Sequence, residues 1–289
     1  MKVEDTVIDW LLEDTNPAIA YRTRSELLGE KADSEKAIQW TKNVLPDGWQ
    51  DVNGLWSTYY YNAIAECGLT RADIEINKNK AIAPYKAEAF DYGCGDFMKL
   101  RALIKLGFID ELNNLGVMEK LKSPQLPDGG FLCLHRIAKM KYIPKSCIKC
   151  NNLALMFVSE CKKQNIKTDI ENDLLKYFWK HSLFYRSNDL STLVLDGREG
   201  WRTIDTFYPF EVMRVGIQNI IEALCVLGYG NDERLNNAWD LLHSKKDDNG
   251  KYILNGTLSK SYLPKEKAGK PSKWVTFYAL LAEKYAKRI

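Results

Sequence analysis

The sequence lacks any run of about 18 consecutive apolar residues, which is the length that a membrane-spanning helix requires. It also lacks an excess of charge, because 41 Lys and Arg side chains are nearly balanced by 38 Asp and Glu and the formal net charge is +3. Nucleic-acid-binding proteins concentrate basic residues on one face. We therefore expect no membrane span and no nucleic-acid partner.

Histidine is scarce, with three in 289 residues, and we find neither a Ser-His-Asp pattern nor a phosphate loop. The first 17 residues carry five acidic side chains and no apolar core, unlike a secretory signal. Seven cysteines, an odd number, are read as reduced thiols of a reducing compartment. These features predict a cytoplasmic protein.

What is present is helical periodicity along most of the chain. Helix signals such as Asn16-Pro17, an N-cap followed by a first-turn proline, mark where segments begin. More polar helices are predicted between helices rich in Ala, Leu and aromatic residues, within a single domain that spans 1–289. The apolar segments are 17–28, 55–67, 95–106, 147–162, 213–227 and 273–286, and the polar ones are 34–44, 110–121, 169–180 and 232–243.

Part of the chain repeats. LRALIKLGF (100–108) matches IEALCVLGY (221–229), an offset of 121 that also carries Gly129 onto Gly250 and Phe131 onto Tyr252. The repeat includes loops that pair Asp or Asn with Gly and an aromatic residue, a chemistry that favours turns. The alternative is two unrelated amphipathic helices that look alike, but it has to explain the loop as well.

Repeated helical units cannot bury their apolar faces alone, so neighbours must stack. The economical arrangement is an all-α fold, an α/α toroid, in which about six inner and six outer helices form a double-layered barrel. An open solenoid is the alternative. It would leave apolar residues of 4–14 and of 273–286 uncovered at its ends, whereas closure of a ring covers both.

The segments WLLEDTNPAIAYRTRSELLG, DGGF, LGYGNDERLNNAWDLLHSK, DNGKY and GKPSKWVTFYALL resemble bacterial proteins with prenyltransferase and squalene-cyclase type repeats, of the terpenoid cyclase and protein prenyltransferase superfamily. The resemblance covers nearly the whole chain and implies the toroid fold. Members of this superfamily bind greasy or peptide substrates in the central cavity. The resemblance therefore implies a small-molecule ligand there.

The acidic motifs of the known enzymes are missing, since neither DxDD nor DDxxD occurs. Two hypotheses remain open. The first is an enzyme of specialised metabolism, such as the transferase or cyclase that the resemblance implies, that acts on an apolar or isoprenoid-like molecule inside the barrel. The second is a non-catalytic binding or scaffold protein that kept the toroid without the cyclase acid. The sequence indicates neither the substrate nor the oligomeric state.

Zinc is the one cofactor that the residues suggest. Thiolate and imidazole are its preferred ligands, and four of them form a closed tetrahedral site. The candidates are Cys133, His135, Cys147 and Cys150, although their spacing is irregular. The alternative is that Cys150 packs in the core and Cys147 is simply a small residue at a helix start.

In a toroid the inner helices run the same way, so their amino ends meet at one end of the barrel. We expect a pocket there, with Cys147 the most reactive thiol because a helix N-terminus lowers thiol pKa values. The alternative reading is ordinary capping, salt bridges and inert buried thiols. The expected catalytic residues are Asp96, Cys147, Asp205 and Arg214, and the expected substrate-binding residues are Trp56, Tyr59, Cys94 and Trp274.

Overall fold

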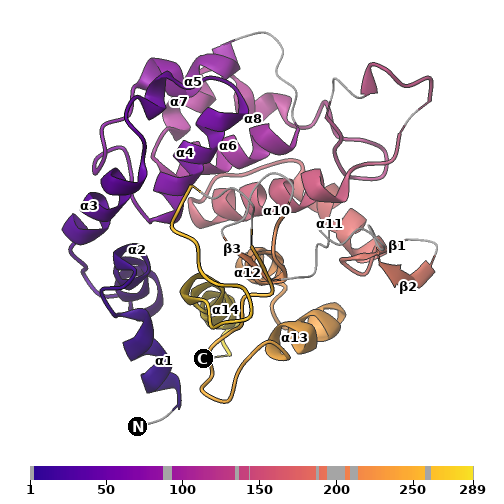
Figure 1. Ribbon diagram of the computed structural model, residues 1–289. Coiled ribbons are helices and arrows are strands. Elements are labelled where there is room, and N and C mark those ends of the chain that lie inside the picture. Colours follow the sequence, from indigo (N-terminus) through magenta and orange to yellow (C-terminus); the bar gives the residue numbers. More distant parts are fainter. Residues whose placement is uncertain are drawn as a thin grey trace.

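The computed structural model describes residues 3–86, 93–133, 137–142, 144–186, 189–193, 206–208, 214–257 and 262–288. Helices make up 55% of the structure, and the strands in this part of the chain form two short two-stranded sheets. The expected all-α class is therefore confirmed (Figure 1). None of the described helices is both long and apolar enough to cross a membrane.

The predicted apolar segments are all helical, within a few residues of the expected bounds, and we call them the core helices. The largest difference is in the fifth, which begins at 217 rather than 213 and so leaves Arg214 before the helix. The core helices are α2 (Pro17–Arg22) continued by the π-helix η1 (Thr23–Leu28), α4 (Leu55–Glu66), α6 (Cys94–Lys105), α10 (Ile148–Lys163), α12 (Ile217–Val226) and α14 (Lys273–Tyr285).

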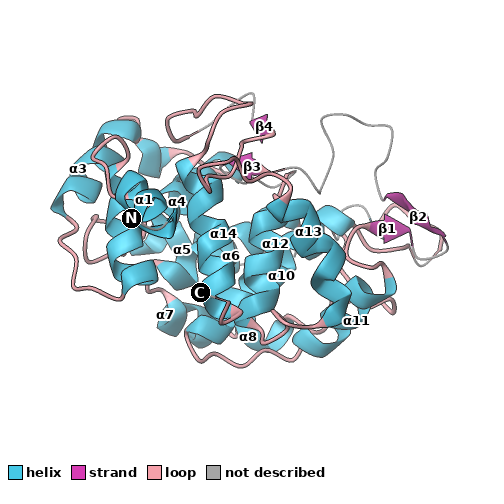
Figure 2. Cartoon of the chain, turned by 90° about the horizontal axis from the view of Figure 1, so that it is seen from below, coloured by secondary structure: helices cyan, strands magenta, loops and turns pink. Residues whose placement is uncertain are grey.

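More polar helices alternate with the core helices, and in Figure 2 α3, α7, α8 and α11 lie at the periphery. The predicted helix 110–121 is divided at Gly116, whose φ of 63° is left-handed. The peripheral segments are α1 (Val3–Leu11), α3 (Glu35–Val44), η2 (Trp49–Asp51), α5 (Lys78–Lys86), α7 (Ile109–Asn114), α8 (Val117–Lys120), α11 (Glu171–Lys180), η4 (Glu233–Leu235) and α13 (Asn236–His243).

The core helices pack in chain order. α6 lies between α4 and α10, α10 packs on α12, and α12 packs on α14 (Figure 1). α14 in turn contacts α2 and η1 at the other end of the sequence. From α2, Arg22 donates a hydrogen bond of 3.0 Å to the backbone oxygen of Glu66 at the end of α4. Each core helix therefore has neighbours before and after it.

The strands are local additions to this helical core. β1 (Tyr185–Arg186) pairs antiparallel with β2 (Asp189–Leu193). β3 (Phe207–Tyr208) pairs in parallel with β4 (Gly256–Thr257). Helix α1 joins the C-terminal region, as expected, because Glu13 just beyond it forms an ion pair of 3.2 Å with Lys273 of α14.

The two copies of the repeated loop dock on the following core helix in the same way. Phe131 and Tyr252 are both fully buried. The backbone N–H of Phe131 donates to Asn151 Oδ1 (2.8 Å), and that of Tyr252 donates to Thr276 Oγ1 (2.9 Å). Their carbonyl groups accept from the N–H groups of the two helix N-caps, at 2.8 and 2.9 Å. These N-caps are Cys147 of α10 and Ser272 of α14, so a thiol occupies the position of a capping hydroxyl.

Candidate functional site

Four cysteines from three segments meet at the amino ends of α6 and α10, and we call them the thiol cluster: Cys94, Cys133, Cys147 and Cys150. Cys94 is the centre, because its side chain is hydrogen-bonded to each of the other three. Cys150 is fully buried, whereas the other three are partly exposed. All four are free thiols, and solvent reaches the three that are partly exposed.

The local fold explains why these thiols meet. α6 and α10 pack side by side, so their first turns are neighbours. Cys94 is the first residue of α6, Cys147 is the N-cap of α10, and Cys150 follows one turn later. The hydrogen bond between Cys147 N and Phe131 O (2.8 Å) holds the 131–133 segment against α10. Backbone contacts therefore fix the positions of all four residues.

The cluster contains one acidic thiol, Cys147, and two thiols, Cys94 and Cys150, whose pKa values are raised. A hydrogen bond with Cys94 lowers the pKa of Cys147 to about 6, although burial opposes this shift. The backbone N–H groups of Lys149 and Cys150 also favour the thiolate, as expected at a helix amino end. The same hydrogen bonds from the three neighbouring thiols raise the pKa of Cys94 far above its usual value.

Cys150 also keeps its proton. Its hydrogen bond with Cys94 lowers the pKa, but burial and the negative charge that develops on neighbouring thiols outweigh that bond, and the net shift is upward. Asp96 is one of the charges that act on Cys150, which places this expected catalytic residue beside the cluster. Its carboxylate accepts a hydrogen bond of 3.1 Å from the backbone N–H of Gly93, so it also caps α6.

The structure thus joins Asp96 with Cys94, Cys133, Cys147 and Cys150. Two other expected residues lie at further amino ends: Tyr59 in α4 stacks on Tyr262 with ring centroids 4.6 Å apart, and Trp274 in α14 is 2% exposed. Arg214 lies over the Phe207 ring at 5.9 Å. Trp56 belongs to the first turn of α4. The Trp56 side chain, His135 and Asp205 lie outside the part of the chain that is described.

A second constellation was not predicted from the sequence, and we call it the charge network. Glu66 is 1% exposed and accepts a hydrogen bond of 2.6 Å from Arg101, with Arg22 and Lys105 each at 3.9 Å. Tyr278 donates a further hydrogen bond to the same carboxylate. Contacts and electrostatic interactions continue to four cations and four carboxylates in all: Arg22, Arg101, Lys105 and Lys163 with Glu26, Glu66, Glu160 and Glu222.

The pKa values in this network show that both signs of charge are retained. Burial raises the pKa of Glu66, but Arg101, Lys105 and Arg22 outweigh burial and lower it to about 2. Lys105 behaves differently, because burial together with Arg22 lowers its pKa to about 8. One signal for the network existed in the sequence. The repeat places Arg101 and Glu222 at equivalent positions inside apolar helices.

Several carboxamide atoms of the core helices are buried without a hydrogen-bond partner. Asn62 Oδ1, both polar atoms of Asn152 and Asn219 Nδ2 make no hydrogen bond within the described part of the chain. They precede Glu66, Glu160 and Glu222 by four, eight and three residues, spacings that keep residues on one face of a helix. Buried polar atoms without partners are costly, so each calls for a water molecule or a ligand.

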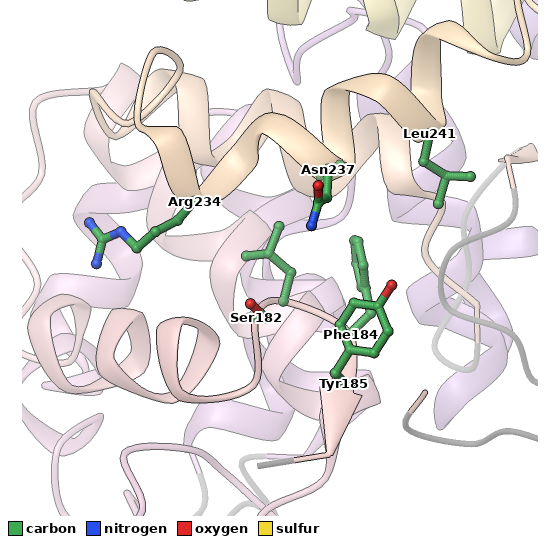
Figure 3. A pocket seen from close by; sticks show the side chains of 8 residues that line it. Ser182, Phe184, Tyr185, Arg234, Asn237 and Leu241 are labelled. Atoms are coloured by element: carbon green, nitrogen blue, oxygen red, sulfur yellow. The ribbon is translucent and has the colours of Figure 1, made fainter. Parts of the chain in front are cut away.

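A small pocket lies elsewhere, between the turn that follows α11 and the η4–α13 segment (Figure 3). It is lined by Ser182, Leu183, Phe184, Tyr185, Arg234, Asn237, Ala238 and Leu241. Its volume of about 30 Å³ suits ordered water rather than a drug-sized ligand. This pocket contains none of the residues expected from the sequence.

Comparison with known proteins adds no relative: no family model, curated protein or solved structure matches the chain. Function is therefore inferred from the thiol cluster, the unpartnered carboxamide atoms and the charge network.

Proposed function

We propose that this protein is an α/α toroid that binds a small molecule with an apolar body, such as an isoprenoid-like compound, in the space between its core helices. The observation that carries the proposal is the charge network, whose members come from α2, η1, α4, α6, α10 and α12, with Tyr278 from α14. Helices in an open row do not bring their first and last members to one cluster, whereas helices around a common axis do.

The ligand would lie on the amino-terminal side of this network. Asn62, Asn152 and Asn219 share helix faces with the network carboxylates and have unused polar atoms. Tyr59 lies nearer the amino end of α4 than the network residue Glu66, and Trp274 lies nearer the amino end of α14 than Tyr278, in both cases by at least one helical turn. Aromatic side chains suit an apolar body, and carboxamides suit a hydroxyl, carbonyl or phosphate oxygen at one end of the ligand.

The thiol cluster supplies the group with chemical reactivity in this proposal. Cys147 has the lowered pKa and partial exposure of a nucleophile or metal ligand. If the protein is an enzyme, a transferase or cyclase reaction would take place beside this cluster. The alternative is a binding or scaffold protein with no turnover, which the absence of DxDD and DDxxD favours.

A thermal-shift screen against isoprenoid alcohols and isoprenoid diphosphates tests ligand binding, because a ligand of the folded state raises the melting temperature. We expect a concentration-dependent rise that is lost in Asn152→Leu and kept in Asn113→Leu, a matched change at an exposed position of α7. A flat response to every compound would contradict the proposal. Product analysis with a ligand that binds then separates the enzyme from the scaffold.

A further inference from the structure

We propose that Cys94, Cys133, Cys147 and Cys150 together bind one soft divalent cation of the zinc class as four thiolates. Sequence spacing alone suggested a different set, with His135 in place of Cys94. The structure makes Cys94 the centre of the cluster, since its sulfur is in hydrogen-bond contact with all three of the others. Four cysteine ligands are the set that a closed tetrahedral zinc site uses.

The remaining cysteines show how an ordinary buried thiol behaves in this chain. Cys67, Cys161 and Cys225 lie on three different core helices or at their ends, and all are buried. Burial is the largest cause of the raised pKa of each of these thiols. They act as small apolar residues. The four members of the cluster are instead in contact with one another, and three of them are partly exposed.

The scaffold around the cluster is suited to a cation site. Cys147 and Cys150 are separated by two residues at the start of a helix, a spacing common to zinc sites. The other two ligands come from the first residue of the neighbouring helix and from a segment tied to α10 by the Cys147 N to Phe131 O hydrogen bond. Backbone positions are therefore set before any metal arrives.

Local charge offsets the excess negative charge of the complex. Four thiolates around a divalent cation carry a net charge of −2. The amino ends of α6 and α10 both face the cluster, and helix amino ends favour negative charge. Lys149 lies between the two α10 ligands, and its charge acts on Cys147.

The thiols hydrogen-bond to Cys94, and no group of three or more His, Cys, Asp or Glu side chains among the described residues is placed to hold a metal ion without rearrangement. Binding would therefore exchange sulfur–sulfur hydrogen bonds for sulfur–metal bonds. Thiol protons are released to solvent, and the side chains rotate from a star around Cys94 to a tetrahedron around the metal. No oxidation or reduction is involved.

Anaerobic titration of the full-length, reduced protein with Co²⁺ tests this proposal, because thiolate ligands give intense charge-transfer absorption and tetrahedral cobalt gives strong visible bands. We expect saturation at one Co²⁺ per chain and displacement by one Zn²⁺. Replacing a ligand should weaken binding at least as much as the roughly 10–100-fold loss seen when groups that support metal ligands are changed. Cys94→Ser and Cys147→Ser should therefore lose affinity to that extent.

Cys161→Ser and Cys225→Ser are the matched controls, and they should bind Co²⁺ as the unaltered protein does, with folding checked by circular dichroism. The proposal is overturned if the reduced protein gives no thiolate charge-transfer band. It is also overturned if Cys161→Ser weakens binding as much as Cys147→Ser. If the protein takes up no metal and forms a Cys147–Cys150 disulfide, the proposal is also overturned, and the cluster belongs to dithiol redox chemistry. If the purified protein shows an iron–sulfur chromophore, the single-ion proposal is overturned in favour of an iron–sulfur cluster.

Discussion

Polar groups at the two ends of the core helices differ in whether they have partners within the protein. At the carboxyl ends, the charge network buries ions and provides each with partners, as in Glu66 with Arg101 at 2.6 Å. At the amino ends, three of the four cluster thiols are partly exposed, and nearby carboxamides such as Asn152 have no partner. Two helices contain both environments: α6 has Cys94 in its first turn and Lys105 in its last, and α10 has Cys150 in its first turn and Lys163 in its last. The polar groups at the carboxyl ends therefore have partners within the protein, whereas thiols and carboxamide atoms at the amino ends remain available to bind a ligand.

This difference separates structure from function along one axis. Buried ions are costly to desolvate and are tolerated only when partners surround them. A network that links helices distant in the sequence therefore specifies their arrangement rather than a reaction. Unused polar atoms and reactive thiols contribute nothing comparable to folding. Their placement at the amino ends is the reason that we locate the ligand and the metal there.

The largest expected effect is at the carboxyl ends. Glu66→Gln should destabilise the fold by about 3–5 kcal/mol, because it leaves Arg101 and its neighbours buried without their carboxylate. Urea unfolding followed by circular dichroism measures the loss. Glu119→Gln, at an exposed position of α8, is the matched control and should change stability little. If the two variants were equally stable, the network would not hold the core together.

Acid should destabilise the protein through the charge network at the carboxyl ends of the core helices. Glu66 and Glu26 have pKa values of about 2 in the folded protein, below the usual carboxyl value of 4.5. A lowered pKa contributes stability that is present above pH 4.5 and is lost as the pH falls toward 2. We expect urea midpoints to decline through that window. The decline should be smaller in Glu66→Gln, and an unchanged slope would contradict the assignment.

Thiol labelling should distinguish the cluster from the core. At neutral pH Cys147 is mainly thiolate and partly exposed, so in metal-free protein it should react at least about tenfold faster than buried Cys161. Peptide mapping after short exposure to a maleimide gives both rates. In urea the two rates should converge. Equal rates in the native protein would remove the distinction between cluster and core thiols.

The smallest expected effect compares two adjacent residues. Asn151 accepts the hydrogen bond from Phe131 N, and Asn152 has no partner, although both are at most 1% exposed. Asn151→Leu should lose about 1–3 kcal/mol, since it leaves a buried N–H unsatisfied. Asn152→Leu should be nearly neutral or stabilising, because it removes buried polar atoms that have no hydrogen-bond partner. A larger loss in Asn152→Leu, measured by urea unfolding, would mean that Asn152 is structural.

The sequence predicts much of the local structure. Turn glycines and helical periodicity located all the core helices, and the offset of 121 anticipated that Phe131 and Tyr252 would occupy equivalent places. The Cys147–Cys150 spacing correctly pointed to the start of α10. Cys94 was expected only as a lining residue, because nothing in its immediate sequence connects it with a cysteine more than 50 positions away. The packing of α6 on α10 makes that connection.

The charge network illustrates the opposite limit. A glutamate or arginine in a helix usually faces solvent, so Glu66 and Arg101 gave no sign of burial by themselves. Their burial depends on partners supplied by other helices, such as Arg22 and Tyr278, at separations of 44 and 212 residues from Glu66. The sequence alone therefore determined which segments form the core helices, to within a few residues, because periodicity and capping are local. Only the tertiary structure decided which charges meet, which thiols cluster and which amides remain unpartnered, because those properties depend on contacts between distant parts of the chain.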